Sequence, residues 1–369
     1  MAEQDRAKRK VIVVGAGIVG ASIGYHLAKR GADVVILDRA GMAAGATGKS
    51  FAWINAHHVK SESYHRLRYQ SLAEYRRLDQ ELDGSLGLNW CGALSFDLLG
   101  EAFDQRFQEF RRLGYPADVL SHQQFQTIEP GYSQAPGRAL HLPMEAAIDP
   151  AVATKALIAG ALEYGAKTLL GDGVETLRHE HGRVTGIETA LGTALTGDVV
   201  LAAGVGAKAI LESVGVDLPM ANRFGVMLHS RPVKPTLNHV IWGDRIHLKQ
   251  NGDGRIVIGE IFSEEWTDRD PDAIAGQMLA DAKRHLPEID LKIDHITIGE
   301  RPIPKDGMPI VGGIEGWRGL YVAVMHSGVT LAPIVGRLAA EELLEGVSFE
   351  MLNPYRLNRF QEPSKTAIS

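Results

Sequence analysis

The 369-residue sequence predicts an α/β protein with one domain on a parallel sheet and a second on a mainly antiparallel sheet. Three observations support this fold class. The chain opens with a strand, a helix and a second strand around a glycine-rich turn. Helical and strand patterns alternate again from residue 149, and residues 220–301 are dominated by strand and turn patterns. A chain of this length can bury a large core and is expected to hold about two domains.

The opening unit is typical of proteins that bind the ADP half of a dinucleotide. An apolar strand at 10–14 leads into Gly15-x-Gly17-x-x-Gly20, followed by a helix at 22–30 and a strand at 34–37. Gly15 permits a sharp turn, Gly17 lets the backbone approach a pyrophosphate, and Gly20 lets helix and strand pack closely. The pyrophosphate is then expected at the helix N-terminus, where free N–H groups and the helix dipole favour anions.

The second strand of the unit ends on an acidic residue. Asp38 follows Gly20 by 18 residues, where a carboxylate can accept both hydroxyls of a ribose. A phosphate on the 2′ position would be repelled there, but because the positively charged Arg39 is adjacent, this pattern does not exclude NADP. A lone glycine motif can be a chance turn, but strand, helix, second strand and acid occur here in the required order.

The rest of the chain alternates between helical and strand patterns. Ser121 is expected to cap a short helix, Asp149-Pro150 to start a longer one, and Asn251–Gly254 to form a hairpin turn. The expected helices span 61–82, 103–113, 121–128, 151–164, 274–286 and 333–344. The expected strands span 88–98, 167–170, 174–178, 184–189, 194–203, 291–301 and 320–324, with further strands between 223 and 260.

Composition limits the possible functions. The net charge of −6 and the absence of a basic face argue against nucleic-acid binding. The chain lacks the run of about 20 apolar residues that a membrane-spanning helix needs. The single cysteine, Cys91, excludes an internal disulfide and a cysteine-rich metal site, and we expect no metal. The N-terminus leads directly into a core strand rather than a cleavable signal, so we expect a cytoplasmic protein.

Two motifs near the end of the chain point to a family. One spans 299–312 and contains Gly-Glu-Arg301-Pro302, and the other spans 320–337 and contains His326-Ser-Gly328. Together with the opening unit, the GATGKSFAW segment at 45–53, the Asp149-Pro150 helix and the Ala-Ala-Gly204 strand end, they resemble the FAD-dependent D-amino-acid oxidase superfamily. Within it, they resemble the glycine oxidase and sarcosine oxidase branch, over essentially the whole chain.

The resemblance implies a Rossmann-like FAD-binding domain of the glutathione-reductase type and a mainly antiparallel substrate domain. We expect residues 1–60, 141–219 and 302–369 in the FAD-binding domain and residues 61–140 and 220–301 in the substrate-binding domain. The second motif is expected to bring a helix N-terminus, with Pro333 in its first turn, to the flavin edge where negative charge accumulates on reduction.

The resemblance and the opening motif together assign the FAD-binding residues. Small residues in 45–52 permit close approach, Thr47 and Ser50 offer hydroxyl donors, and Lys49 is placed either on phosphate or in solvent. Cys91 does not match the family's attaching cysteine, and neither His57 nor His58 lies at the matching spacing, so FAD is expected to bind noncovalently. The assigned residues are Gly15, Gly17, Ile18, Val19, Gly20, Asp38, Arg39, Gly45, Ala46, Thr47, Gly48, Ser50, Phe51, Ala52, Val174, Ala202, Ala203, Gly204, Arg301, Ser327, Gly328, Val329 and Thr330.

Four residues are candidates for substrate chemistry. Arg301 matches the family arginine that clamps a substrate carboxylate, a task for which a planar guanidinium is suited; the alternative is a surface salt bridge with Glu300 or Asp306. Where glycine oxidase has a second arginine, this chain has His326 or Ser327. His247 and Lys249 alternate to one face of a strand, either towards the flavin or on a solvent-facing edge.

Three functions are consistent with these residues. The favoured one is FAD-dependent oxidation of an amino acid or amine that carries a carboxylate, with oxygen or a quinone or other electron-transfer partner as acceptor. The second is a 2-hydroxy-acid or polyol-phosphate dehydrogenase, which would need a base such as His326 or His247. The third is a flavin-binding electron-relay subunit of a larger complex. A homo-oligomer is also compatible with the sequence.

Overall fold

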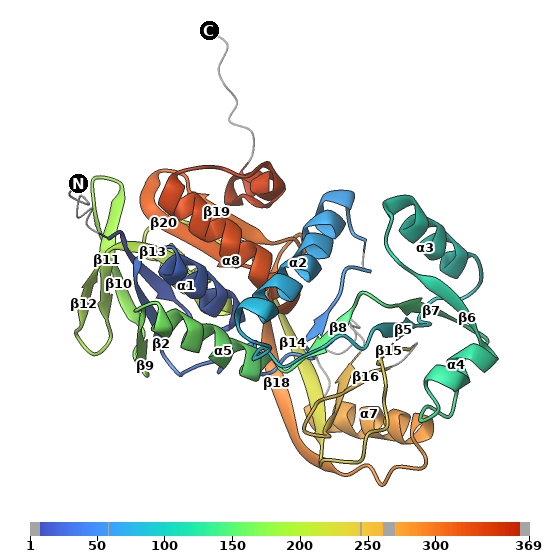
Figure 1. Ribbon diagram of the computed structural model, residues 1–369. Helices are drawn as coiled ribbons and strands as arrows, with labels where there is room; N and C mark the ends of the chain where they lie inside the picture. Colours follow the sequence, from blue (N-terminus) through green and yellow to red (C-terminus); the bar gives the residue numbers. More distant parts are fainter. Residues whose placement is uncertain (1–7, 58, 244–245, 261–269, 362–369) are drawn as a thin grey trace.

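The computed structural model describes residues 8–57, 59–243, 246–260 and 270–361. They form a nine-stranded sheet, an eight-stranded sheet and a small three-stranded sheet, with helices packed on them (Figure 1). The predicted α/β fold class with a second, mainly antiparallel sheet is confirmed.

The nine-stranded sheet is built around the opening βαβ unit. β1 (Lys10–Val14) lies between β2 (Asp33–Asp38) and β13 (Asp198–Leu201), and the three strands are parallel. β9 (Lys167–Leu170) extends the parallel set beside β2, and β20 (Trp317–Val324) extends it beside β13. The carboxyl ends of these strands therefore meet at one edge, where ligands of open α/β sheets bind.

Both faces of this sheet are covered by apolar cores. On one face α1 (Ile18–Lys29) packs between α5 (Pro150–Glu163) and α8 (Gly328–Glu345) (Figure 1). Alternate residues of β1 enter different cores, as the period of two in a strand requires. The remaining elements of this part are β10 (Val174–Glu180), β11 (Arg183–Thr189), β12 (Ala194–Thr196), α6 (Ala207–Glu212) and β19 (Ile310–Ile314).

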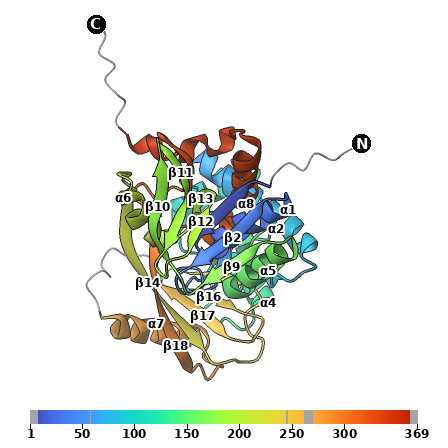
Figure 2. The same ribbon diagram turned by 90° about the vertical axis from the view of Figure 1, so that its left-hand side faces the viewer.

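The eight-stranded sheet is dominated by two long strands. β14 (Met220–Ser230) and β18 (Ile293–Pro304) pair antiparallel along their whole length, and Figures 1 and 2 show them running from the first sheet to α7. The other elements here are β5 (Ala93–Ser95), α3 (Gly100–Leu113), β6 (Asp118–Ser121), α4 (His122–Ile128), β7 (Arg138–Leu142), β15 (Val240–Trp242), β16 (Ile246–Gln250), β17 (Ile256–Glu260) and α7 (Pro271–His285).

A small sheet and a long helix join the two parts. β3 (Trp53–Ile54), β8 (Ala146–Ile148) and β4 (Leu88–Asn89) form the three-stranded sheet. α2 (Glu62–Glu81) begins at Ser61, whose Oγ accepts the Tyr64 N–H at 3.2 Å, and packs against α8. The largest apolar core is continuous across both parts, since it includes side chains from α1, α8, β5 and β15.

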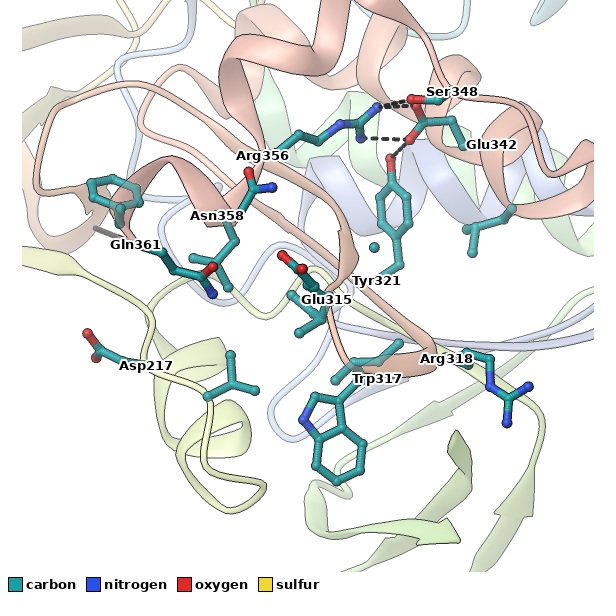
Figure 3. Close-up of a pocket in the computed structure, with 18 of the residues that line it drawn as sticks. Asp217, Glu315, Trp317, Arg318, Tyr321, Glu342, Ser348, Arg356, Asn358 and Gln361 are labelled. Atoms are coloured by element: carbon teal, nitrogen blue, oxygen red, sulfur yellow. Dashed lines mark hydrogen bonds and ion pairs between the residues drawn. The ribbon is translucent and has the colours of Figure 1, made fainter. Parts of the chain in front are cut away.

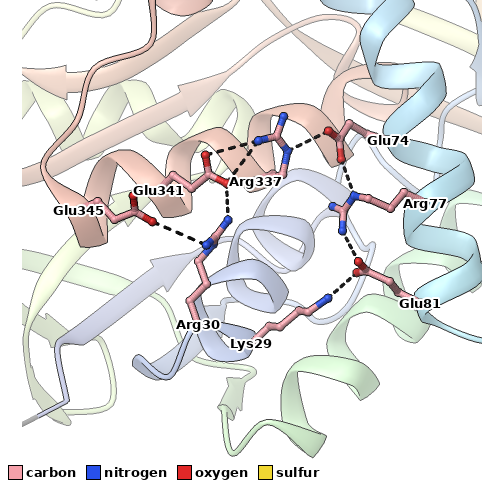
Figure 4. Close-up of polar contacts among 8 residues, drawn as sticks. All are labelled: Lys29, Arg30, Glu74, Arg77, Glu81, Arg337, Glu341 and Glu345. Atoms are coloured by element: carbon pink, nitrogen blue, oxygen red, sulfur yellow. Dashed lines mark hydrogen bonds and ion pairs between the residues drawn. The ribbon is translucent and has the colours of Figure 1, made fainter.

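Ion pairs also tie α2 to α1 and α8 (Figure 4). Arg337 Nε on α8 donates to Glu74 Oε1 on α2 at 2.8 Å, and Lys29 Nζ on α1 contacts Glu81 Oε2 at 2.7 Å. Arg30 and Arg77 extend the chain of contacts to Glu341 and Glu81. Because these charges face solvent in part, each pair contributes at most about 1 kcal/mol, and the network mainly fixes orientation.

Three local expectations were wrong. The strand expected at 88–98 is split into β4 and β5 around Gly92 (φ 73°), and the strand expected at 194–203 is split into β12 and β13 at Gly197 (φ 155°). Pro333 is the sixth residue of α8, not part of its first turn. Its missing N–H would have bonded the Val329 carbonyl, which instead accepts a hydrogen bond from the Tyr75 hydroxyl.

The helices after Ser121 and Asp149 are confirmed. Ser121 and Gln124 form a reciprocal capping box at the start of α4. The Asp149 carboxylate accepts the N–H groups of Ala151 and Val152 at 2.9 and 3.1 Å, and Pro150 occupies the first position of α5. For the domains, we propose the discontinuous division into 1–60, 141–219 and 302–369 against 61–140 and 220–301; β7 and β18 cross its bounds.

Candidate active site

The glycine-rich turn after β1 is tightly enclosed. Gly15 has φ +113°, and a Cβ on Gly15 or Gly20 would overlap the carbonyl oxygen of Ala202 or of Gly15 itself. α1 starts at Ile18 after Gly17, which has no side chain to cap it. Its first-turn N–H groups therefore point to the carboxyl end of β1, in the arrangement that binds phosphates.

The loop after β2 closes over this turn. Ala43 N donates to Ala16 O at 2.9 Å, and Ile18 N donates to Thr47 Oγ1 at 3.1 Å. Ala43 and Ala52 have φ of 57° and 55°, a left-handed conformation that costs energy for alanine and is concentrated at functional loops. The small residues predicted in this loop are thus held close to the start of α1.

The Asp38 carboxylate accepts hydrogen bonds from the backbone around it. Its Oδ2 accepts Ala16 N at 2.8 Å, and its Oδ1 accepts the N–H groups of Ala40 and Gly41 at 2.8 and 2.9 Å. A carboxylate has about four acceptor positions, so these bonds use most of them. Asp38 thereby fixes the shape of the turn, and its contact with both ribose hydroxyls stays a prediction.

The other predicted ADP-site residues lie around the ends of β1 and β2. Ala202 N donates to Val14 O at 2.8 Å, which places the Ala202–Gly204 strand end against the glycine turn. Gly171 N donates to Asp38 O at 2.8 Å, and a Cβ on Gly173 would contact Arg39 Cβ at 3.3 Å. Val174 begins β10 next to this contact, so the fold gathers these segments at one sheet edge.

A cavity of about 740 Å³ lies between the two large sheets. Its walls come from the loop after β2, from α2 and α3, from β14, β15, β16 and β18, and from the start of α8. The described lining consists of Ala46, Lys49, Ser50, Phe51, Ala52, Trp53, Asn55, Val59, Lys60, Tyr64, Arg68, Arg106, Glu109, Ala221, Arg223, Gly225, Met227, Trp242, His247, Gly299, Glu300, Arg301, Pro302, Ile303, Lys305, Asp306, Gly307, His326, Ser327, Val329 and Thr330.

Arg301 lies in this cavity on β18. Its guanidinium lies across Gly225 of β14, because a Cβ added to Gly225 would be 2.5 Å from Arg301 Cζ and Nε. The base of the Lys49 side chain lies against the neighbouring Gly299, with its Cβ 2.9 Å from the position of an added Cβ. Gly225 and Gly299 face each other across the two strands, so this glycine pair leaves space for the Arg301 guanidinium and for the stem of Lys49. Asp306, one alternative partner for Arg301, is bonded by Arg359 at 2.8 Å.

Both candidate histidines line the cavity and are neutral at ordinary pH. Burial lowers the pKa of His247 to about 3, with Arg301 as a further cause, and its ring stacks on Trp242 at 4.6 Å. Burial and then Arg301, followed by Lys60, Arg68 and Arg223, lower the pKa of His326 to about 3. An imidazole with such a pKa is a weak base, which argues against either ring as a general base near pH 7.

Lys249 lies behind the cavity rather than in its described lining. Its Nζ donates to Ile148 O at 2.7 Å and to Ala52 O at 3.3 Å, and burial lowers its pKa to about 8. Both His247 and Lys249 are buried on β16, which lies between β15 and β17. The alternative of a solvent-facing edge strand is therefore wrong.

The start of α8 forms another wall. Ser327 Oγ accepts the Tyr64 hydroxyl at 2.9 Å and makes no capping bond to its own helix. Thr330 Oγ1 donates to Trp53 O at 3.2 Å, which fastens α8 to β3. Because Val329 and Thr330 line the cavity with His326 and Ser327, the N-terminal end of the α8 dipole faces it.

Sequence reasoning missed several buried polar residues near the cavity. Arg68 on α2 is 4% exposed, donates to Asn55 Oδ1 and lies over the Tyr64 ring. A signal was present, since an arginine four residues after Tyr64 falls on the apolar face of α2. His57 is buried against Glu145 at 3.1 Å, consistent with a packing role, and His58 lies outside the described residues.

A second cavity, of about 1000 Å³, lies elsewhere, between the β19–β20 hairpin, the end of α8 and residues 357–361 (Figure 3). Three polar side chains in its lining bond to one another, because Glu342 forms an ion pair with Arg356 and accepts a hydrogen bond from the Tyr321 hydroxyl at 2.7 Å. None of the sequence-predicted site residues belongs to its described lining.

The residues around the first cavity fit a flavin dinucleotide. The first turn of α1 faces the glycine turn, with Ile18 N bonded to Thr47 Oγ1, and Gly15 and Gly20 leave no room for side chains. The cavity adjoins the loop after β2. Among the described residues, no group of three or more histidine, cysteine or acidic side chains could hold a metal ion. No helix in the described ranges has the length and apolarity needed to cross a bilayer. Fold and site together define a dinucleotide-binding oxidoreductase.

Comparison with known proteins names the family. The family model for FAD dependent oxidoreductases, DAO, matches residues 10–342, and the chain belongs to this family. Its cofactor is therefore FAD, and the resemblance to the D-amino-acid oxidase superfamily, with relatives named glycine oxidase, is confirmed. The chain is an enzyme of the FAD-dependent amine and amino-acid oxidoreductases.

Its relatives include proteins named for amino-acid oxidation. A glycine oxidase of Bacillus licheniformis is 27% identical, over 96% of this chain and 98% of its own. A bifunctional protein ThiO/ThiG of Trichormus variabilis is 29% identical over 97% of this chain, which spans only 56% of that protein. The crystal structure of glycine oxidase from Geobacillus kaustophilus has a TM-score of 0.85 at 26% identity, covering 95% of this chain and 99% of that one.

Proposed function

We propose that the protein oxidises the carbon–nitrogen bond of an amino acid or related amine that carries a carboxylate. The observation that supports this most strongly is Arg301, whose guanidinium is positioned over Gly225 inside the interdomain cavity. A guanidinium offers two parallel donors to a carboxylate and does not lose its charge near neutral pH. The names of relatives such as glycine oxidase are in keeping with this substrate class.

The proposed roles follow from position. The start of α1, the loop at 41–52 and the Ala202–Gly204 strand end would hold FAD noncovalently, and Cys91 lies outside the described lining of the cavity. Bound FAD supplies the acceptor for the hydride that leaves the α-carbon. The N-terminal end of α8 would stabilise negative charge that develops beside it. The imine product then hydrolyses to a carbonyl compound and an amine or ammonia.

The electrostatics of the cavity favour the neutral substrate amine that this reaction needs. The cations that lower the pKa of His326 would also lower the pKa of an ammonium group bound beside it. The proton can then be lost to solvent before oxidation. Oxidation of a hydroxyl requires a base to remove its proton, and both histidines are poor bases. This disfavours a 2-hydroxy acid or a polyol phosphate as the substrate.

The first experiment is the visible absorption spectrum of the purified protein, repeated anaerobically with amino acids and N-methyl amines. We expect flavin bands that bleach with a carboxylate-bearing amine. Bands that bleach only with a hydroxy acid, or with none of the compounds, would favour the dehydrogenase or electron-relay function. Peroxide formation on admitting air would identify oxygen as acceptor, and its absence would favour a quinone or electron-transfer partner.

The role of Arg301 is tested separately. Arg301→Lys should keep FAD bound but raise the apparent KM steeply, because a lysine cannot reproduce the two-pronged contact. Unchanged kinetics with a carboxylate substrate would contradict the assignment. A cytoplasmic location, which is consistent with a single cysteine, and a homo-oligomer remain proposals of the same kind.

A further inference from the structure

Lys249 is a buried cation to which the proposed chemistry gives no role. Its side chain is 2% exposed and lies outside the described lining of the active-site cavity. Burial lowers its pKa to about 8, and the Asp149 carboxylate is the largest influence in the opposite direction. Burying an ammonium group is costly unless the group is well hydrogen-bonded. The hydrogen bonds that Nζ makes therefore indicate what a lysine does at this position.

These hydrogen bonds join two sheets. Nζ donates to Ile148 O at 2.7 Å and to Ala52 O at 3.3 Å. Lys249 belongs to β16 of the eight-stranded sheet, whereas Ile148 ends β8 of the three-stranded sheet and Ala52 immediately precedes β3 of that sheet. Ile148 N also donates to Ala52 O at 3.3 Å. Lys249 thus connects the eight-stranded sheet to the end of the loop after β2.

Ala52, which accepts one of these hydrogen bonds, has a strained backbone. Its φ of 55° is left-handed, a conformation that brings the Cβ of an alanine too close to a carbonyl oxygen. Ala52 N donates to Ser50 Oγ at 3.0 Å, while Ala52 O accepts Lys249 Nζ and Ile148 N. Hydrogen bonds on both sides of the residue therefore fix both of its backbone dihedrals. Such conformations persist only where the surrounding contacts hold them.

The same face of β16 also contacts the residue before Ala52. His247, two residues before Lys249, packs edge-on against the Phe51 ring with a centroid distance of 4.5 Å. Lys249 Nζ lies 5.7 Å from the centroid of that ring. Phe51 and Ala52 both line the cavity. Two side chains of β16 therefore position two consecutive residues of the cavity wall, one through its ring and the other through its backbone.

We propose that Lys249 is a positioning residue for the cofactor: it holds Ala52 in the left-handed conformation and so shapes the segment at 50–52 against which FAD binds. A lysine suits this task because its long stem reaches two carbonyls and its amino group has an N–H for each. The inference rests on one part of the proposed function, the placement of FAD against the loop at 41–52. It does not depend on which substrate is oxidised.

The test begins with Lys249→Met, which removes the donor and keeps most of the apolar stem. The full-length, FAD-loaded protein is diluted, and the rise in flavin fluorescence gives the rate of FAD release. The visible spectrum reports the surroundings of the flavin that stays bound. Without Lys249, Ala52 is free to leave the left-handed conformation. We expect FAD release to become about 5- to 30-fold faster, which corresponds to the strain of one such residue.

A second substitution tests whether Lys249 acts through Ala52. Ala52→Gly in the Lys249→Met background should return the release rate to within about 2-fold of the unaltered protein, because glycine adopts positive φ without the steric cost. Ala43→Gly is the matched control. Ala43 has φ 57° in the same loop, but its carbonyl accepts Gly48 N at 2.9 Å. Each glycine variant is also measured with Lys249 intact, and this double-mutant cycle should show coupling for Ala52 and none for Ala43.

Unchanged FAD release and an unchanged spectrum in Lys249→Met would overturn the inference. Faster release that Ala52→Gly does not correct, or that Ala43→Gly corrects equally, would also overturn it, because Lys249 would then act through general packing. If Lys249→Met fails to fold, Lys249→Gln, which keeps N–H donors on a shorter side chain, is measured with the same two glycine variants.

These outcomes are distinct from those of the proposed function. If amines bleach the flavin but Lys249→Met releases FAD at the unaltered rate, only the role of Lys249 is refuted. If no amine bleaches the flavin, the proposed amine oxidation fails, while the rate of FAD release still tests Lys249 because it requires no substrate.

Discussion

Replacing Gly225 by alanine moves Arg301 without changing its chemistry. The added Cβ would lie 2.5 Å from Arg301 Cζ and Nε, well inside van der Waals contact. The far end of a flexible side chain can shift at little cost, so the clash should displace the guanidinium and leave the sheet folded. Gly225 has no positive φ, and alanine in a strand is favoured over glycine by roughly 0.5–1 kcal/mol.

The magnitude follows from the contact that is lost. Hydrogen bonds to a charged group contribute about 1.5–3 kcal/mol, which corresponds to about a 10- to 150-fold lower kcat/KM for a carboxylate substrate. Steady-state kinetics and stopped-flow flavin reduction measure this loss, while the visible spectrum reports retained FAD. Gly276→Ala on α7 is the matched control, because no atom lies within 4 Å of its added Cβ.

The result that refutes this reasoning is a Gly225→Ala protein with bound FAD and unchanged kcat/KM. It would mean that the position of Arg301 over Gly225 is not the one used in substrate binding. A variant that loses both FAD and cooperative unfolding would instead show that the backbone of the sheet shifts to relieve the clash. That result would contradict our expectation that the flexible Arg301 side chain moves.

Three further predictions concern the cofactor, the core and pH. Gly17→Val should yield protein without flavin absorption bands, since even a Cβ there lies 3.0 Å from Thr47 Oγ1; retained flavin would contradict the phosphate site. Tyr75→Phe should lower the free energy of unfolding in urea by about 1–3 kcal/mol, because the Val329 carbonyl loses its donor. Adding Pro333→Ala should recover part of this loss by restoring an N–H, and no recovery would count against the explanation. The folded protein holds His247 neutral with a pKa of about 3, so its contribution to stability is complete above pH 6.5 and is lost as the pH falls towards 3. Unfolding free energies at pH 7 and 4 should show up to about 3 kcal/mol less pH dependence in His247→Gln, and an unaltered dependence would refute this contribution.

The sequence alone was sufficient for the nucleotide-binding half of the site. The geometry of the turn at Gly15–Gly20 is set largely by residues close to one another in the chain, and Gly15 and Gly20 are required because a Cβ there would overlap the backbone of Ala202 or of Gly15 itself. The caps at Ser121 and Asp149 are equally local, because each side chain bonds an N–H within three residues. Such features depend little on tertiary packing, so the pattern predicts them well.

The substrate half could not be derived in this way. The pairing of Arg223 with Arg301 depends on the register between β14 and β18, which are separated by more than 60 residues. The burial of Lys249 depends on β16 being an inner strand, and strand order is not visible in a local pattern. Pro333 is tolerated inside α8 because the Tyr75 hydroxyl, on another helix, donates a hydrogen bond to the Val329 carbonyl that would otherwise have bonded the N–H of residue 333.

There is a physical reason why the nucleotide-binding half could be predicted from the sequence and the other half could not. Glycine turns and helix caps are determined by backbone sterics and by hydrogen bonds within a few residues, so the sequence by itself determined the dinucleotide fold and the glycine turn at which a phosphate is predicted. The charge and shape of the cavity arise where α2, β14, β18 and α8 meet. Long-range packing brings those elements together, and only the tertiary structure decided which cations line the cavity.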